Sequence, residues 1–134
     1  MSATTTASLF FVELTVDDLD AAVEWYRKVL GLRQVMRDAN AFALLGAGAT
    51  RLALRRGKPS PGGVLLAFEV ADLDEWARRF AENGEQLEDA IRTSDEGYRR
   101  ARVCDADGYA VCVFERTDER RDGVDAEAPT PSRD

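Results

Sequence analysis

The 134-residue chain contains no histidine and only two cysteines. Without histidine a conventional nucleophile–histidine triad cannot be built. The two cysteines, Cys104 and Cys112, fit a reduced cytosolic protein better than a disulfide framework. They lie on either side of the turn-like residues 105–109. A hairpin closing at this turn would place Cys104 opposite a residue near 110, so we do not expect the two thiols to pair.

Long apolar runs and an excess of positive charge are also missing. No run approaches the roughly 18 apolar residues that a membrane-spanning helix needs. Residues 1–8 lack the basic and apolar regions of a secretory signal, so we expect a cytoplasmic protein without a membrane partner. The net charge is −7, and no basic stripe with aromatic residues is present, which argues against nucleic acid as a partner. A 45% hydrophobic fraction is ordinary for a protein with a buried core.

One pattern occurs twice in the chain. Residues 11–20 and, 54 positions later, residues 65–74 each carry an alternating apolar run that ends in Val and is followed by Asp-Leu-Asp. The alternation predicts a strand. The residues after it have helical spacing, with Asp18 and Asp72 as N-caps and Gly31 and Gly84 as stop signals. Asp72 and Glu75 also have the spacing of a capping box.

Three short strand candidates follow each helix. We expect strands near 8–16, 32–37, 41–45 and 50–55 in the first half, and near 64–70, 86–91, 98–104 and 109–115 in the second. Each half therefore has the order βαβββ, which predicts an α+β fold of two tandem modules. The expected single domain covers 1–117, with module 1 at about 8–56, a linker at 57–62 and module 2 at about 63–116. Residues 118–134 are polar and acidic, and we expect a flexible tail.

The combined motifs resemble a known superfamily. They are Val-Asp-Asp-Leu-Asp at 16–20, Glu-Trp-Tyr-Arg-Lys-Val-Leu-Gly-Leu at 24–32, Ala-Phe-Glu-Val-Ala-Asp-Leu-Asp at 67–74 and Asp-Ala-Asp-Gly-Tyr at 105–109. Together, over roughly residues 8–116, they resemble the vicinal oxygen chelate superfamily, also called the glyoxalase/bleomycin-resistance/dioxygenase superfamily. The resemblance implies two paired modules that form a U-shaped cleft, often completed in a homodimer.

The same resemblance places metal ligands of the metal-dependent members at three positions of this chain. They are occupied here by Phe11, Leu65 and Cys112. Phe and Leu have no lone pair to donate, and one thiolate cannot form the ligand set of a catalytic ion. We therefore predict a chain without a metal or other cofactor, similar to the metal-free, bleomycin-resistance-like branch.

The predicted ligand-binding side chains line the cleft side of the strands. By alternation and resemblance they are Leu9, Phe11, Glu13, Phe42, Leu65, Ala67, Tyr98, Arg100, Cys112 and Phe114. The alternative is that Phe11 and Leu65 simply fill the former metal cavity. Alternation aims Arg100 and Arg102 to one side and Arg99 to the other, where they either reach the cleft and hold an anion or stay in solvent. Trp25 and Trp76 are expected to pack in the core.

Glu13 admits two interpretations. In an apolar cleft its pKa would rise, and it could act as a proton acceptor or contact a cationic ligand. Alternatively, it is a carboxylate at the cleft mouth, hydrated or paired with an arginine.

The leading hypothesis is a metal-independent binding protein that sequesters a small aromatic or apolar ligand, antibiotics included, as a homodimer. One alternative is a metal-independent isomerase or cyclase with Glu13 as general base. Another is a non-catalytic regulatory or accessory dimer module.

Overall fold

The computed structural model describes residues 5–95 and 97–117. The chain divides between Ser60 and Pro61, inside the predicted linker, into two units that each contain one module. The first module consists of β1 (Phe11–Val16), α1 (Leu19–Leu30), β2 (Arg33–Asp38), β3 (Phe42–Ala47) and β4 (Thr50–Arg56). The second consists of β5 (Leu65–Glu69), α2 (Leu73–Glu82), β6 (Arg92–Ser94), β7 (Tyr98–Cys104) and β8 (Ala110–Arg116). The predicted tail lies outside the described residues.

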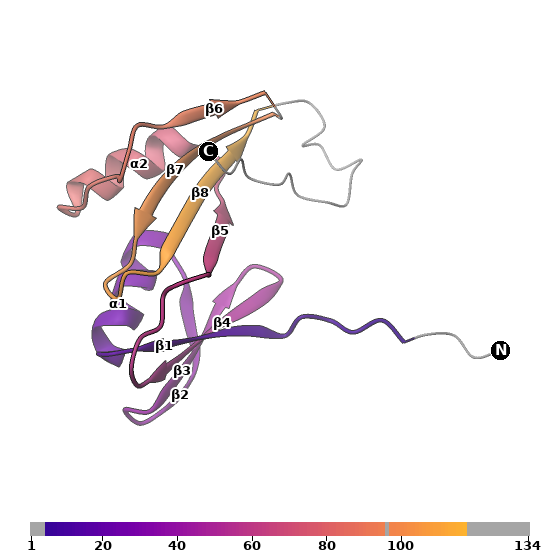
Figure 1. Ribbon diagram of the computed structural model, residues 1–134, viewed down its shortest axis with the longest axis vertical. Coiled ribbons are helices and arrows are strands. Elements are labelled where there is room, and N and C mark those ends of the chain that lie inside the picture. The colour runs from indigo at the N-terminus through magenta and orange to yellow at the C-terminus, as the bar shows by residue number, and fades with distance from the viewer. Residues whose placement is uncertain (1–4, 96, 118–134) are drawn as a thin grey trace. The chain divides into compact units, whose positions relative to one another are not determined.

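Each module is a four-stranded mixed sheet with one helix on it (Figure 1). The strand orders are β1-β4-β3-β2 and β5-β8-β7-β6. In both sheets the first strand pairs in parallel with the last strand of its module, and the remaining pairs are antiparallel. The predicted α+β fold of two βαβββ modules is confirmed.

The helix boundaries follow from the capping residues. The carboxylate of Asp18 accepts a hydrogen bond from the backbone N–H of Ala21 (3.1 Å), and Gly31 ends α1 with φ +70°. In α2 the carboxylate of Asp72 accepts from the N–H of Glu75 (3.0 Å). Glu75 does not complete the predicted capping box, because its own carboxylate binds Arg78 and Arg79. The box is therefore only half formed.

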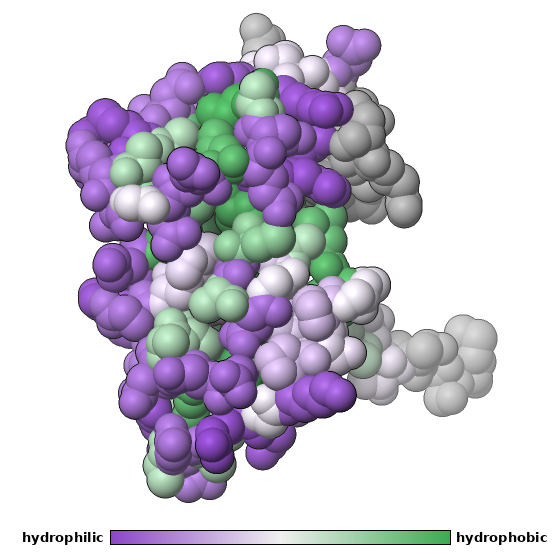
Figure 2. All heavy atoms as spheres, turned by 60° about the vertical axis from the view of Figure 1, so that its left-hand side comes forward, coloured by the Kyte–Doolittle hydropathy of each residue, from purple (hydrophilic) through white to green (hydrophobic). Residues whose placement is uncertain are grey.

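The helices bury the apolar faces that the sequence indicates. The side chains of α1 that are buried are Leu19, Ala22, Trp25, Tyr26 and Val29. Trp25 packs edge to face on Tyr26, which confirms its predicted place in the core. Trp76 on α2 is only partly buried, and its ring stacks on Phe80. Hydrophilic side chains cover much of the face shown in Figure 2, where hydrophobic atoms are limited to patches.

Two predicted strands differ from the observed ones. The first strand begins at Phe11 rather than Ser8, because the ladder with β4 begins at the pair Phe11 and Arg51. Before it, the carbonyls of Leu9 and Phe10 accept hydrogen bonds from the side-chain hydroxyl of Thr50 instead (both 3.1 Å). The strand expected near 86–91 is wrong: β6 spans 92–94, where the backbone meets β7. Within 86–91, Glu88 makes a single backbone hydrogen bond to Arg102.

The turn at 105–109 has the predicted hairpin geometry. One carboxylate oxygen of Asp105 accepts from the backbone N–H groups of Asp107 and Tyr109, both at 2.9 Å. Cys104 lies opposite Ala110, and both cysteines are free, as expected. Among the described residues no helix is both long and apolar enough to cross a membrane.

Candidate functional site

Each sheet has a face that packs on its helix and an opposite face, here called the helix-distal face. In the first module Leu14, Val16, Leu52 and Leu54 are buried on the helix side. Strand alternation therefore places Phe11, Glu13, Phe42 and Arg55 on the first helix-distal face. Three of these four belong to the predicted site.

Arg55 joins the polar and aromatic parts of the first helix-distal face. Its Nε lies 3.2 Å from a carboxylate oxygen of Glu13, and its guanidinium lies over the ring of Phe42 at 4.7 Å. The Glu13 side chain keeps 35% of its accessible surface. Of the two interpretations of Glu13, the structure therefore matches the arginine-paired carboxylate rather than a carboxylate isolated in an apolar environment.

Exposed apolar side chains lie at the start of β1. Phe11 is 38% exposed, and the centroid of its ring lies 5.8 Å from that of Phe10. The guanidinium of Arg51 lies over the Phe10 ring, 4.6 Å from its centroid. Leu9 is 69% exposed and lies before the strand. Leu9 was placed on a strand face from its alternation, and this assignment is wrong because no strand pairs with it.

The second helix-distal face brings most of the remaining predicted residues together. The strand register aligns Ala67, Cys112 and Arg102 in one row, and Glu69, Phe114 and Arg100 in the next. Tyr98 packs edge to face on Phe114 with 6.1 Å between ring centroids. Tyr98, Arg100, Cys112 and Phe114 are buried, whereas Ala67 is exposed and Leu65 is 43% exposed.

The three consecutive arginines of β7 separate as alternation predicts. Arg99 lies on the helix side, where its guanidinium binds the carboxylate of Asp74 at 3.0 Å. Arg100 and Arg102 lie on the helix-distal face, in register with Phe114 and Cys112. Burial raises the pKa of the Cys112 thiol, and the positive charges of these two guanidinium groups offset only part of that increase.

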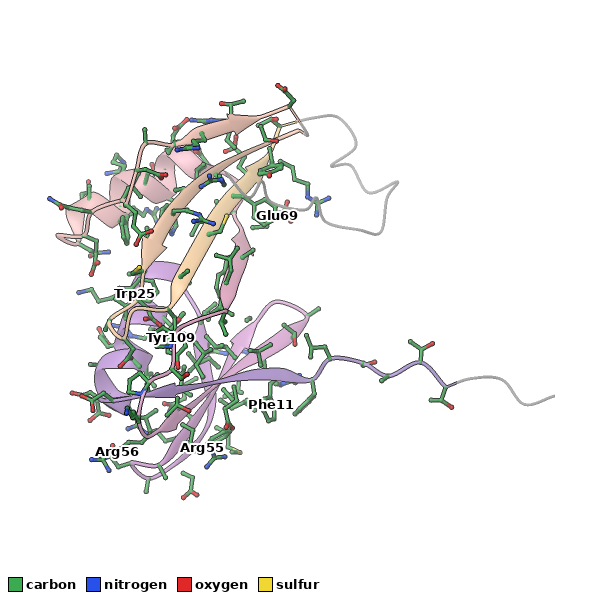
Figure 3. The ribbon with its side chains drawn as sticks, in the orientation of Figure 1. Phe11, Trp25, Arg55, Arg56, Glu69 and Tyr109 are labelled. Carbon is green, nitrogen blue, oxygen red and sulfur yellow. The ribbon has the colours of Figure 1, made fainter. Side chains whose placement is uncertain are left out.

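Sequence reasoning missed two ion pairs of these faces. Arg55 was not selected because its position beside Glu13 depends on the parallel pairing of β1 with β4. Arg116 was missed for a similar reason: it binds both carboxylate oxygens of Glu69, at 3.0 and 2.9 Å, across the ends of β8 and β5. Figure 3 labels Glu69 at the end of β5. What the sequence did show is that each arginine lies near the end of an expected strand, at an alternating position that places it on the helix-distal face.

The side chains at the three positions that the resemblance implies for metal ligands do not fit a metal centre. Phe11 and Leu65 have no donor atoms, and burial raises the pKa of Cys112, which favours a protonated thiol. In the parts of the chain that the structure describes, no three potential ligands among His, Cys, Asp and Glu gather closely enough to hold an ion.

The chain is similar in sequence or in structure to several known proteins. A protein of Mycolicibacterium smegmatis, itself uncharacterized, is 33% identical over 105 residues, covering 77% of this chain and 89% of that protein. The structure of TioX from Micromonospora sp. ML1 has a TM-score of 0.69 at 27% identity, covering 82% of this chain and 99% of TioX. Lactoylglutathione lyase from Agrobacterium tumefaciens has a TM-score of 0.71 at 24% identity, covering 84% and 96%; at this identity the likeness concerns the fold alone.

The family model described as the Glyoxalase/Bleomycin resistance protein/Dioxygenase superfamily matches residues 8–113. This range includes both βαβββ modules almost completely and ends within β8. The chain belongs to the glyoxalase/bleomycin resistance protein/dioxygenase superfamily.

Proposed function

We propose that this protein is a metal-independent binding protein that sequesters a small aromatic or apolar molecule on the helix-distal face of a module. The observation that carries the proposal is the matched pair Phe11 and Leu65. They open equivalent strands of the two modules and remain 38% and 43% exposed. Large apolar side chains that stay accessible on a sheet face favour ligand binding, since burying them against a ligand releases free energy.

The donor chemistry of these faces supports metal independence. Two of the three positions at which metal-dependent relatives are expected to hold ligands carry hydrocarbon side chains, and the third carries a buried thiol. Binding on such faces relies on apolar burial and aromatic contact rather than on polarisation by an ion.

The Glu13–Arg55 ion pair supports binding over turnover. An isomerase or cyclase that used Glu13 as its general base would need the reacting proton within hydrogen-bond reach of that carboxylate. Arg55 already occupies one side of the carboxylate and also covers Phe42. The pair is therefore better suited to orient a polar group of a ligand than to remove a proton from it.

A neutral aromatic dye tests the proposal directly. We expect N-phenyl-1-naphthylamine to bind the full chain saturably, with an increase in fluorescence and no change on addition of EDTA or Mn²⁺. Phe11→Ser should weaken this binding several-fold. Phe10→Ser is the matched control, because Phe10 is more exposed (57%) but lies before β1.

The proposal would be refuted if the chain did not bind this dye and calorimetric titrations with planar antibiotics and aromatic metabolites also showed no binding. Binding that depends on added metal would refute its metal-independent part. The predicted homodimer stays a prediction, which light scattering of the purified chain would test.

A further inference from the structure

The helix-distal face of the first module contains one row of residues without a carboxylate. The strand register aligns Phe11 on β1, Arg51 on β4, Gly46 on β3 and Arg33 on β2. Residues that lie directly opposite each other in paired strands point to the same face of the sheet. An exposed aromatic ring, two arginines and a glycine therefore lie side by side within a single module.

The acidic residues of this face do not neutralise the two arginines of the row. Glu13, in the next row, pairs with Arg55 at 3.2 Å. Asp38 lies at the opposite end of β2 from Arg33. Within the described part of the chain, neither Arg51 nor Arg33 forms an ion pair. This end of the face is therefore positive, although the net charge of the chain is −7.

The hydrogen-bond donors of Arg51 are available to a ligand. Its partly buried guanidinium lies over the ring of Phe10, 4.6 Å from the centroid. Stacking of this kind occupies a flat side of the guanidinium and leaves the N–H groups at its edge. Among the described residues these N–H groups bond to no acceptor. An anion that approaches in the plane of the guanidinium can therefore accept two hydrogen bonds from it.

Gly46 leaves an opening between the two arginines. Arg51 and Arg33 are two strands apart, which separates their backbones by about 10 Å. The backbone does not require glycine at this position, because its φ is not left-handed. An added Cβ would meet Cγ1 of Val35 at 3.7 Å and the carbonyl oxygen of Arg33 at 3.8 Å, which are ordinary contacts. The missing side chain thus leaves room for a ligand group beside Val35, which is itself exposed.

We propose that the opening over Gly46 binds the anionic group of the ligand while the ring of the ligand lies against Phe11. Arg51 makes the direct contact with the anion, and the more exposed Arg33 makes the second. The preferred ligands are then aromatic carboxylates or sulfonates rather than aromatic cations. This inference rests on the proposed binding function and narrows its ligand class. One sheet supplies the whole site.

Two dyes that share one ring system separate the anionic contact from the apolar one. 8-Anilinonaphthalene-1-sulfonate is N-phenyl-1-naphthylamine with an added sulfonate. In fluorescence titrations of the full chain at low ionic strength, we expect Arg51→Gln to weaken binding of the sulfonate dye about fivefold or more. The same substitution should change the affinity for the neutral dye by less than about twofold, since the apolar contact at Phe11 remains.

Arg56→Gln is the matched control. Arg56 lies on the same strand and is exposed, but alternation places it on the helix side of the sheet. This variant removes the same charge from the chain and should leave both affinities unchanged. Arg33→Gln should weaken sulfonate binding by a smaller factor than Arg51→Gln. Arg51→Lys should restore part of the loss, because the charge returns without the planar guanidinium.

Gly46→Val tests the opening without changing any charge. A β-branched side chain suits a strand, and here it would fill the space between the arginines. We expect the sulfonate dye to lose affinity about as much as in Arg51→Gln. Ala47→Val, which adds bulk on the opposite face of β3, should have no effect. Thermal unfolding checks that both variants are folded, and Arg51→Gln decides the matter if Gly46→Val is not.

The outcomes distinguish the anion site from the binding function. If Arg51→Gln weakened both dyes equally, left both unchanged, or weakened the sulfonate dye no more than Arg56→Gln, the anion site would be overturned. Binding of the neutral dye that depends on Phe11 would still support the binding function in that case. If neither dye bound, the anion site would be lost as well, and the calorimetric titrations would decide the binding function.

Discussion

The thiol of Cys104 donates a hydrogen bond to the carboxylate of Glu88, with 2.6 Å between Sγ and Oε2. This bond, together with partial burial and the negative charges of Glu88 and Asp105, raises the pKa of Cys104 to about 11. The thiolate is the reactive form of cysteine. An exposed cysteine is thereby kept protonated and unreactive near neutral pH.

We predict that Glu88→Gln accelerates alkylation of Cys104 by iodoacetamide at about pH 8 by roughly tenfold or more, because its pKa falls back toward 9.0. Peptide mapping by mass spectrometry separates Cys104 from the buried Cys112. The folded pKa is raised, so the stabilising contribution of this bond is complete below 9.0 and is lost as the pH rises through about 11. Glu85→Gln serves as the control, and an unchanged rate in Glu88→Gln would show that the bond does not control reactivity.

Gly31 is predicted to be required for the end of α1. Its φ is +70°, and a Cβ added there would meet no atom within 4 Å, so only the backbone conformation opposes a side chain. Gly31→Ala should lower the free energy of unfolding by about 1–2 kcal/mol in urea denaturation. Gly62→Ala is the matched control, since Gly62 has the same open surroundings without a positive φ. Equal effects of the two substitutions would contradict the explanation.

Removing the Glu13–Arg55 pair should change stability little. The side chains are 35% and 52% exposed, so water screens their attraction. We expect Glu13→Gln to reduce the free energy of unfolding by less than about 1 kcal/mol, as measured by urea denaturation. Glu24→Gln, which removes the exposed pair with Arg27, gives the reference value for a surface ion pair on α1. A loss of several kcal/mol from Glu13→Gln alone would mean that Glu13 has a structural role instead.

The sequence predicts well what is determined over a few residues. The N-cap aspartates at 18 and 72 and the left-handed Gly31 mark the helix ends because their hydrogen bonds and φ angles are local. The separation of Arg99 from Arg100 follows from simple alternation. The turn after Cys104 is equally local, since Asp105 bonds to residues two and four positions away.

Features that depend on distant pairing were harder to predict. The edge strand β6 has only three residues, and its position is set by β7 rather than by its own pattern. The partner of Glu13 could not be chosen among the 18 lysines and arginines without knowing that β1 lies beside β4. For the same reason the sequence left open whether Glu13 is isolated or paired.

The parallel pairing of the first and last strands also has a consequence for folding kinetics. Phe11 meets Arg51, 40 positions later, and Leu65 meets Ala110, 45 positions later. Each module must therefore close a long loop before its outermost pairing is gained, which slows folding relative to a chain of local hairpins. Because this closure happens once in each unit, we expect refolding to show two kinetic phases. A substitution in one parallel strand pair, β1–β4 or β5–β8, should slow only the phase of its own module.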